Sequence, residues 1–281
     1  MFEKLSILGA GLLGASVMQA AKKRGVAKKC VAWSRSAGTR KLCAKADFCD
    51  AVFDTPEAAV AGADCVVACV PVDKIVPLLA DCAATISPAA LVTDVGSTKA
   101  AICADAKKLL PAGVGFVGSH PMAGSELNGF AHGNAELLQN RLCFVANDAE
   151  PRLIDLAQKF WQGLGMRTRL VDPAEHDAIV AHVSHLPHAV AAALSAALAQ
   201  KPAEWRDCGA GGLRDTTRVS AGNPHVWQAI LEENRAEIIP ALSEFLAKFS
   251  ELKSALERGD SEALLALLSA ASNWRLPLSQ N

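Results

Sequence analysis

The stretch Leu5-Ser6-Ile7-Leu8-Gly9-Ala10-Gly11-Leu12-Leu13-Gly14 decides the fold of the first half of the chain. A short apolar run that can form a strand leads into a G-x-G-x-x-G loop, which opens a helix. In this context small residues let the backbone turn tightly and approach a pyrophosphate, whose charge meets free N–H groups at the helix N-terminus. The stretch therefore predicts a dinucleotide site that includes Gly9, Gly11, Leu12, Leu13 and Gly14.

Short apolar runs continue to alternate with helical stretches up to residue 171. The run at residues 65–70 is apolar on both faces, as a strand covered by helices on both sides must be. The alternation predicts an α/β fold with a doubly wound, mostly parallel Rossmann-type sheet. The expected strands are residues 5–8, 30–33, 65–70, 91–95, 115–118, 142–146 and 166–171.

After Asp172-Pro173, where Asp can cap a helix and Pro can occupy its first turn, the pattern changes. Residues 179–199, 226–256 and 263–268 have helical periodicity, and glycines interrupt them at 209–212, 222–224 and 259–260. We predict two domains: a dinucleotide-binding domain at 1–171 and an all-helical substrate and dimerisation domain at 172–281. Surplus apolar surface on 226–256 favours a homodimer over one compact helical bundle.

Composition excludes several classes of function. The 281 residues carry 28 Lys plus Arg and 29 Asp plus Glu, a net charge of −1, so no nucleic-acid partner is expected. The least polar stretch, 189–199, is much shorter than the ~20 residues of a membrane span, and the N-terminus leaves no room for a leader, so we expect no membrane partner and a cytoplasmic location. The nine cysteines are odd in number and form no C-x-x-C pair, which favours reduced, buried thiols.

The end of the second expected strand indicates which dinucleotide fits. A carboxylate there binds the ribose 2′-OH of NAD and repels a 2′-phosphate. The segment Val31-Ala32-Trp33-Ser34-Arg35-Ser36 contains no acid, while Ser34 can donate a hydrogen bond and Arg35 can bind a phosphate. NADP is therefore the preferred cofactor, with NAD and a solvated Arg35 as the alternative. The predicted cofactor contacts also include Ser36, Val70 and Pro71.

A histidine motif follows the strand expected at 115–118: Gly118-Ser119-His120-Pro121-Met122-Ala123-Gly124-Ser125-Glu126. Ligands of open α/β sheets bind outside the carboxyl ends of the strands, where His120 would lie. With an unperturbed pKa of ~6.5, histidine suits a base at neutral pH. The alternative is a structural hydrogen bond in a turn.

Two more motifs lie in the helical half: His182-Val183-Ser184-His185-Leu186-Pro187-His188 and Gly211-Gly212-Leu213-Arg214-Asp215-Thr216-Thr217-Arg218. Together with the glycine loop and the His120 motif, they resemble the prephenate and arogenate dehydrogenase family of tyrosine biosynthesis, over nearly the whole chain and in order. The three histidines could instead bind a metal, but Pro187 interrupts the segment and no cysteine is near. We expect no metal.

The resemblance implies an oxidative decarboxylation. A cyclohexadienol acid transfers its C4 hydride to the nicotinamide and loses its ring carboxylate as carbon dioxide, which leaves 4-hydroxyphenylpyruvate or tyrosine. In the family the C4 hydroxyl is held by a histidine that matches His120 and a serine that matches Ser97, in Thr93-Asp94-Val95-Gly96-Ser97-Thr98-Lys99. Positioning and electrostatics, rather than covalent chemistry, would then carry catalysis.

The implied substrate is a small dicarboxylate or an amino acid, so its pocket needs fixed cations. Arg218 matches the family's carboxylate-binding arginine, and a surface ion pair with Asp215 is the alternative. His185 and His188 match residues that line the pocket, and a histidine at 188 mildly favours prephenate over arogenate. Substrate-side contacts are also expected from Ser125. Glu126 and Asp215 match acidic positions that gate or orient the site, and Trp227 matches an aromatic contributed across the dimer.

Two other classes of protein are compatible with the sequence. A hydroxyacid dehydrogenase or imine reductase has a similar architecture, but the hydroxyacid enzymes place a lysine base in the first long interdomain helix, and residues 179–198 contain no lysine. A non-catalytic nucleotide-binding protein would keep the glycine loop and use the helices for association. In that class His120 and Arg218 would be dispensable.

Overall fold

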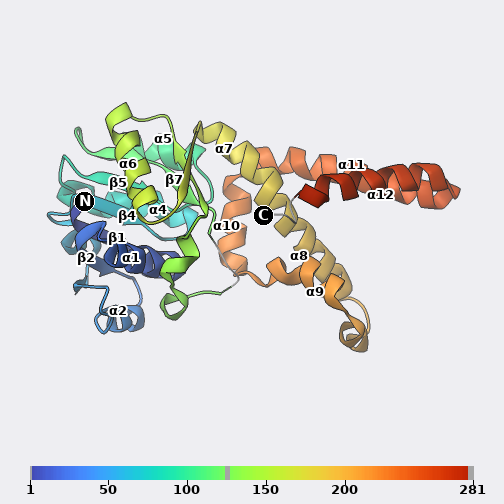
Figure 1. Cartoon of the computed structure of the whole chain (residues 1–281), viewed down its shortest axis with the longest axis horizontal. Coiled ribbons are helices and arrows are strands. Elements are labelled where there is room, and N and C mark those ends of the chain that lie inside the picture. The colour runs from blue at the N-terminus through green and yellow to red at the C-terminus, as the bar shows by residue number, and fades with distance from the viewer. Residues whose placement is uncertain (1, 124–126, 278–281) are drawn as a thin grey trace. The chain divides into compact units, whose positions relative to one another are not determined.

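Strand β1, Phe2–Leu8, lies inside a six-stranded sheet whose neighbouring strands are all parallel (Figure 1). The structure is a computed structural model that describes residues 2–123 and 127–277. The strand order is β3-β2-β1-β4-β5-β6, that of a Rossmann fold, so the predicted doubly wound sheet is confirmed. The other strands are β2 Ala27–Trp33, β3 Ala51–Phe53, β4 Cys65–Ala68, β5 Leu91–Asp94 and β6 Gly115–Val117.

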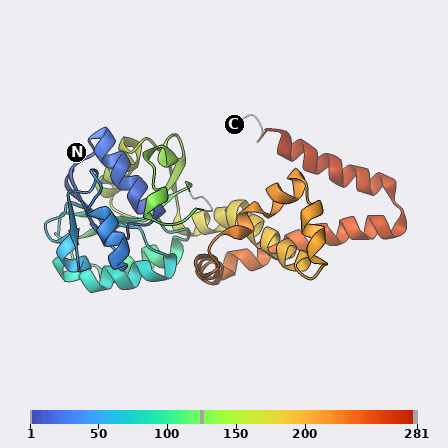
Figure 2. The same ribbon diagram turned by 90° about the horizontal axis from the view of Figure 1, so that it is seen from below.

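Helices cover both faces of this sheet (Figure 2). Successive residues of β4 alternate between two cores: Val67 packs with residues of α1, and Val66 packs with residues of α4 and α5. This two-sided burial explains why the strand is apolar throughout. The helices of this part are α1 Leu12–Arg24, α2 Ala37–Cys43, α3 Pro56–Val60, α4 Val72–Cys82, α5 Ala100–Leu109 and α6 Pro151–Gly163, with 3₁₀ turns at Ala83–Thr85, Phe130–His132 and Ala135–Leu138.

A second sheet holds three strands, β7 Ser119–Pro121, β8 Leu142–Ala146 and β9 Arg167–Val171, in the order β7-β8-β9. The sequence prediction that placed residues 142–146 and 166–171 in the main sheet is therefore wrong. It also missed β3 and β7, because three residues are too few to show a period. Gly118 alone separates β6 from β7, and a Cβ there would lie 2.4 Å from Cys103 Sγ, so only glycine fits this bend.

The segment after Asp172 is helical, as predicted. Asp172 Oδ1 accepts hydrogen bonds from Ala174 N and Glu175 N, and Pro173 occupies the first turn. Helix α7 (Pro173–Val180), a π-helical turn (Ala181–His185) and α8 (Leu186–Leu198) form one continuous helix (Figure 1). The helix is followed by a 3₁₀ segment Ala203–Cys208, α9 Gly211–Thr217, a 3₁₀ turn Arg218–Ala221 and α10 Pro224–Glu233.

The helix Pro173–Leu198 is much longer than the apolar stretch singled out in the sequence. By length and composition it is the one helix in the described part of the chain that could cross a membrane. It also carries the buried polar residues His176, Asp177 and His185. Asp177 accepts hydrogen bonds from the backbone of Lys99 and Ala100, so this polar part of the helix contacts the start of α5.

The chain forms two compact units, Met1–Arg235 and Ala236–Asn281. The second unit contains most of α11 (Arg235–Arg258) and α12 (Ser261–Arg275), joined at Gly259, whose φ of 65° favours glycine. The segment expected at 226–256 is thus a helix pair, α10 and α11, broken at Asn234. The division at residues 171 and 172 stays a prediction.

Candidate active site

The glycine loop after β1 is shaped as its sequence predicts. Gly9 has a φ of 104°, and a Cβ there would lie 2.4 Å from the Cys69 carbonyl oxygen. A Cβ on Gly14 would lie 2.1 Å from the Gly9 carbonyl oxygen, whereas one on Gly11 would meet nothing within 4 Å. Gly9 and Gly14 are therefore required by the protein's own packing, and the open space at Gly11 is where a ligand could approach the N-terminus of α1.

A cavity of about 620 Å³ lies beside this loop. Its size is typical of small-molecule sites, and it opens at the carboxyl ends of β1, β2 and β4. Six of the predicted cofactor residues line it: Gly9, Ser34, Arg35, Ser36, Val70 and Pro71. The other four, Gly11, Leu12, Leu13 and Gly14, do not line the cavity and form the start of α1.

The connection between β2 and α2 is held in place by Arg40, which sequence reasoning did not single out. Its Nη1 donates to the carbonyl oxygens of Ser34, at 2.7 Å, and Arg35, at 3.1 Å, and its Nε donates to Asp54. Ser36 Oγ caps α2 by accepting from Thr39 N. The Arg35 side chain is exposed at the cavity, where it could reach a phosphate.

His120 begins a series of buried hydrogen bonds. It lies on β7, and its Nδ1 is 2.9 Å from His176 Nε2 on α7. His176 Nδ1 is in turn 2.8 Å from Asp177 Oδ1. The Asp177 carboxylate also accepts from Lys99 N, at 2.7 Å, and Ala100 N, at 2.9 Å, where α5 begins. The series joins β7 and the start of α5 to α7.

Burial keeps both histidines of this series uncharged. His120 is 7% exposed, and its pKa lies well below the ordinary 6.5 because burial disfavours the imidazolium, and repulsion from a protonated His176 and from Lys99 would disfavour it further. Burial also lowers the pKa of His176, and the hydrogen bond to Asp177 offsets only part of that effect. Both rings are therefore neutral near pH 7.

A buried ion pair lies next to Ser97 and His120. Lys99 and Asp94 are both almost fully buried, and Lys99 Nζ is bonded to an Asp94 carboxylate oxygen. The same carboxylate accepts from Ser119 N and Gly96 N, at 2.9 and 2.8 Å. Asp94 therefore holds together the end of β5, the turn that carries half-buried Ser97 and the residue before His120.

A second histidine, His185, lies fully buried in the π-helical turn. Its Nδ1 is 3.0 Å from Asn234 Nδ2, which also donates to the Asp177 main-chain carbonyl at 2.9 Å. Burial lowers the pKa of His185 to about 4, although an interaction with the Ser97 backbone acts in the opposite direction. The structure thus brings predicted residues His185 and Ser97 together.

His188 and Trp227 are also brought together, because their rings stack at 3.5 Å with an interplanar angle of 9°. Trp227 further meets His185 edge-on at 6.2 Å. The resemblance implied an aromatic contributed across a dimer, whereas here Trp227 packs on histidines of its own chain. His182 is exposed, with Nδ1 2.9 Å from Ala178 O, so the three histidines of the motif do not converge.

Arg218 and Asp215 are exposed on α9 and the turn after it. In the same turn Ser220 Oγ is 2.8 Å from Ser195 Oγ on α8. Ser195 follows His188 by seven residues, roughly 10 Å along a helix. Within one chain Arg218 therefore lies toward the far end of α8 from the histidines, and its convergence with His120 stays a prediction.

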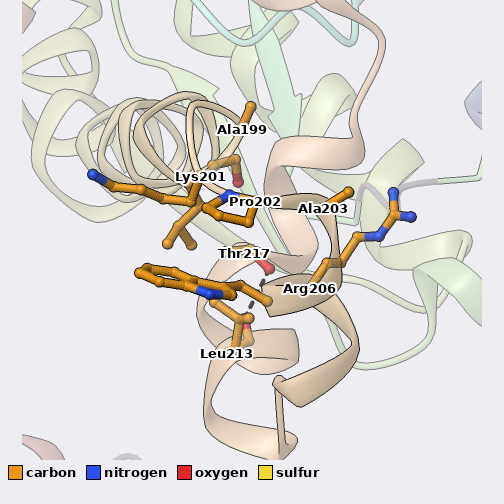
Figure 3. Close-up of a pocket in the computed structure, with 10 residues that line it drawn as sticks. Ala199, Lys201, Pro202, Ala203, Arg206, Leu213 and Thr217 are labelled. Atoms are coloured by element: carbon orange, nitrogen blue, oxygen red, sulfur yellow. Dashed lines mark hydrogen bonds between the residues drawn. The ribbon is translucent and has the colours of Figure 1, made fainter.

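Ser125 and Glu126 lie outside the described residues, which end at Ala123 and resume at Leu127. A cavity of about 420 Å³ near the end of α8 is lined by Trp205, Arg206 and Leu213, among others (Figure 3). It contains none of the predicted site residues. The candidate site is therefore the region around His120, Ser97 and His185, at the carboxyl end of β5.

Sequence reasoning missed five residues of this region: Asp94, Lys99, His176, Asp177 and Asn234. Asp94 had a usable signal, because a carboxylate at the carboxyl end of a parallel strand lies at the ligand edge of the sheet. The His-Asp pair at 176–177 had a weaker signal, as two ionisable residues early in an apolar helix. Asn234 had none, since an asparagine between two helices is usual in a connection.

Comparisons with known proteins indicate the same family over nearly the whole chain. Residues 17–170 match the prephenate dehydrogenase nucleotide-binding domain, and residues 172–270 match the prephenate dehydrogenase dimerization domain. A cyclohexadienyl dehydrogenase of Zymomonas mobilis is 31% identical over 284 residues, with 99% of this chain and 97% of that protein covered.

Two solved structures are similar along nearly the full chain. One is the prephenate dehydrogenase of A. aeolicus in complex with hydroxyphenyl propionate and NAD⁺, with a TM-score of 0.91, 25% identity and 99% of each chain covered. The other is the arogenate dehydrogenase of Synechocystis, with a TM-score of 0.81, 28% identity and coverage of 98% of this chain and 99% of that one.

Proposed function

The chain belongs to the prephenate dehydrogenase family, and on that premise we propose that it catalyses the oxidative decarboxylation of prephenate, arogenate or both in tyrosine biosynthesis. The observation that carries the proposal within this chain is the buried series His120, His176 and Asp177, which lies next to the carboxyl end of β5 in the nucleotide-binding sheet. The hydroxyacid dehydrogenase or imine reductase alternative is not favoured, because prephenate dehydrogenase models match both halves of the chain.

The reaction requires three events at one substrate. The C4 hydrogen leaves with the bonding electron pair as hydride, and the C4 hydroxyl passes its proton to a base. The ring carboxylate then departs as carbon dioxide and leaves its electron pair in the ring, which becomes aromatic, and the proton returns to the C4 oxygen to give the phenol. A bound nicotinamide dinucleotide supplies the hydride acceptor. Packing at Gly9 and Gly14 and the open space at Gly11 fit its pyrophosphate. The protein must supply a proton acceptor and hold the substrate.

The hydrogen-bond series supports His120 as that proton acceptor. The Asp177 carboxylate can only accept, so His176 Nδ1 must donate to it. His176 is neutral, so its Nε2 accepts and His120 Nδ1 donates. His120 is also neutral, which leaves its Nε2 as a lone pair available to the C4 hydroxyl. When His120 takes the proton, the His176–Asp177 pair stabilises the positive charge.

We assign the substrate side to the residues that the resemblance identifies. Ser97 would hold the C4 hydroxyl with His120, and the remaining groups would bind the side chain and carboxylates of a dicarboxylate or amino acid. This set contains Arg218, His185, His188, Trp227, Asp215, Ser125 and Glu126. Two contacts support the assignment: His185 lies beside the Ser97 backbone, and the Trp227 ring stacks on His188.

The cofactor is a nicotinamide dinucleotide, with NADP preferred and NAD as the alternative. In support, no acid follows β2, and Arg40 holds the backbone of Ser34 and Arg35 so that the Arg35 side chain is at the cavity. We further propose a cytoplasmic homodimer. The match to a dimerization domain supports the dimer, as do large exposed apolar side chains on α11 and α12, namely Leu246, Phe249, Leu256, Leu265, Leu268 and Trp274.

One set of assays tests the function. The kcat/KM of the full chain is measured for prephenate and for arogenate, each with NAD⁺ and with NADP⁺, by the absorbance of the reduced cofactor. We expect turnover of at least one substrate, with NADP⁺ the better cofactor. His120→Asn should lower kcat by roughly 10²–10⁴, and Arg218→Ala should chiefly raise KM. No reduced cofactor in any of the four combinations would contradict the proposal.

A further inference from the structure

Asp177 directs two hydrogen-bond series with different atoms. Its carboxylate accepts a hydrogen bond from His176 Nδ1. Its main-chain carbonyl accepts from Asn234 Nδ2 at 2.9 Å, and the same Nδ2 lies 3.0 Å from His185 Nδ1. Asn234 is 3% exposed and His185 is fully buried, so solvent does not compete for these bonds. The second series therefore has a defined starting point in the protein backbone.

The polarity of this second series follows from its chemistry. A carbonyl oxygen only accepts, so the Asn234 amide must turn its nitrogen, and not its oxygen, toward Asp177. An amide nitrogen only donates, and its second hydrogen points at His185. His185 Nδ1 must therefore accept. Because the ring is neutral, its one hydrogen is on Nε2.

We infer that Asn234 holds His185 in the tautomer protonated at Nε2, so that His185 donates a hydrogen bond to an oxygen of the bound substrate. Asp177 thus sets opposite polarities on two histidines, an acceptor at His120 Nε2 and a donor at His185 Nε2. The substrate part of this inference rests on the proposed function. The tautomer rests only on the hydrogen bonds, which makes Asn234 a positioning residue.

The surroundings of His185 Nε2 support a ligand as its acceptor. The atom is buried beside the Ser97 backbone and makes no hydrogen bond of good geometry with the described residues. The nearby Ser97 main chain is only a poorly aligned acceptor for this N–H group, and a buried donor that lacks a well-placed acceptor is unfavourable and rare in native proteins. An oxygen of a substrate held at Ser97 would satisfy it.

The same geometry excludes His185 as a second base. A base would need its lone pair on Nε2 and its hydrogen on Nδ1, where that hydrogen would face an Asn234 N–H at 3.0 Å. Two donors would then oppose each other in a buried place. Burial also lowers the pKa of His185 to about 4, so the doubly protonated ring is not formed near pH 7.

The tautomer can be measured without any substrate. In the ¹⁵N-histidine-labelled full chain, long-range ¹H–¹⁵N spectra distinguish the two neutral tautomers, and the His185 signals are assigned by their loss in His185→Gln. We expect Nε2 protonated in the unaltered protein. In Asn234→Asp the introduced carboxylate accepts from Nδ1, so the tautomer should invert. In Asn234→Ala both tautomers should be populated.

The activity of the same proteins tests the donor role. Asn234→Asp should reduce kcat/KM for the better substrate by roughly 10- to 100-fold, the worth of one hydrogen bond to a charged group. Gln228→Ala, on the exposed face of the same helix α10, is the matched control and should stay within about twofold of the unaltered protein.

Each result decides a separate point. A His185 protonated at Nδ1 in the unaltered protein would overturn the tautomer, whatever the variants do. An inverted tautomer with unchanged kcat/KM would overturn the donor role. An unaltered protein that has the expected tautomer but turns over neither prephenate nor arogenate would support the series and overturn the proposed function.

Discussion

At the scale of single residues, the site depends on oxygen atoms that can accept hydrogen bonds but cannot donate them. Asp177 supplies two such groups, a carboxylate and a carbonyl, and the side chains His176 and Asn234 carry their polarity to His120 and His185. No charge needs to move for this ordering. The protonation state of His120 is therefore set before any ligand arrives, which is the preorganisation that electrostatic catalysis requires.

Replacing the Asp177 carboxylate by an amide tests this ordering. In Asp177→Asn the side chain can present an N–H to His176 Nδ1, which reverses the tautomers of His176 and His120 and places a hydrogen on His120 Nε2. We expect kcat to fall by roughly 10²–10⁴, with a smaller change in KM, in steady-state assays.

The matched control for that variant is Asp172→Asn, at the exposed start of the same helix. Asparagine caps helices as well as aspartate does, so activity should be retained. If Asp177→Asn kept full kcat while folding normally, the series would have no part in proton transfer.

At the scale of elements, the connection between β2 and α2 shows how a loop becomes a binding surface. Ser36 caps α2, and Arg40 on that helix donates to the carbonyl oxygens of Ser34 and Arg35. These bonds hold the backbone of the loop while the Arg35 side chain stays exposed at the cavity. A loop whose backbone is already held in this way loses less conformational freedom when a phosphate binds.

Arg35→Ala therefore tests cofactor preference. Loss of charge-assisted hydrogen bonds to a 2′-phosphate should raise KM for NADP⁺ by roughly 10- to 100-fold and leave KM for NAD⁺ nearly unchanged. Initial rates at varied cofactor concentration measure both values. Lys41→Ala, an exposed cation on α2, is the control and should change neither. An equal effect of Arg35→Ala on both cofactors would contradict a role at the 2′ position.

Strand β7 is the element on which the site depends most and the one with the weakest sequence signal. Its three residues pair antiparallel with β8, so that His120 lies opposite Phe144. Phe144 also meets the His176 ring edge-on at 5.3 Å. The orientation of His120 is thus decided by a strand more than 20 residues away in sequence, which no local pattern of Ser119–Pro121 reveals.

At the scale of the whole molecule, the buried neutral histidines link stability to pH. Burial lowers the pKa values of His120, His176 and His185 in the folded chain, for His185 to about 4. Below about pH 6.5 the unfolded chain binds protons at these positions and the folded chain does not. Stability is therefore complete above that pH and is lost as the pH falls toward the folded pKa values.

Urea unfolding at a series of pH values measures this linkage. Each such histidine should reduce the free energy of unfolding by about 1.4 kcal/mol per pH unit between pH 6.5 and its folded pKa. In His185→Gln we expect the change in the free energy of unfolding with pH to be smaller by about 1.4 kcal/mol per pH unit, the contribution of one histidine. A free energy of unfolding that stays constant from pH 6.5 to 4.5 would contradict the burial of neutral rings.

The sequence alone determined the architecture and the chemical class of this protein. The glycine loop, the apolar strands and the helical periodicity after Asp172 are encoded by neighbouring residues, because turns, strands and helices are set by local geometry. The motifs around His120, His185 and Arg218 indicated the family for the same reason, since each is a short contiguous segment.

Only the tertiary structure decided which residues of the site are hydrogen-bonded to one another. It moved the strands at 142–146 and 167–171 into a second sheet, and it placed His176 on His120, 56 residues away. Asn234 reaches His185 over a separation of 49 residues. Such contacts depend on how packed elements face one another, and a hydrogen bond's direction depends on the last acceptor in its series, so neither can be deduced from spacing along the chain.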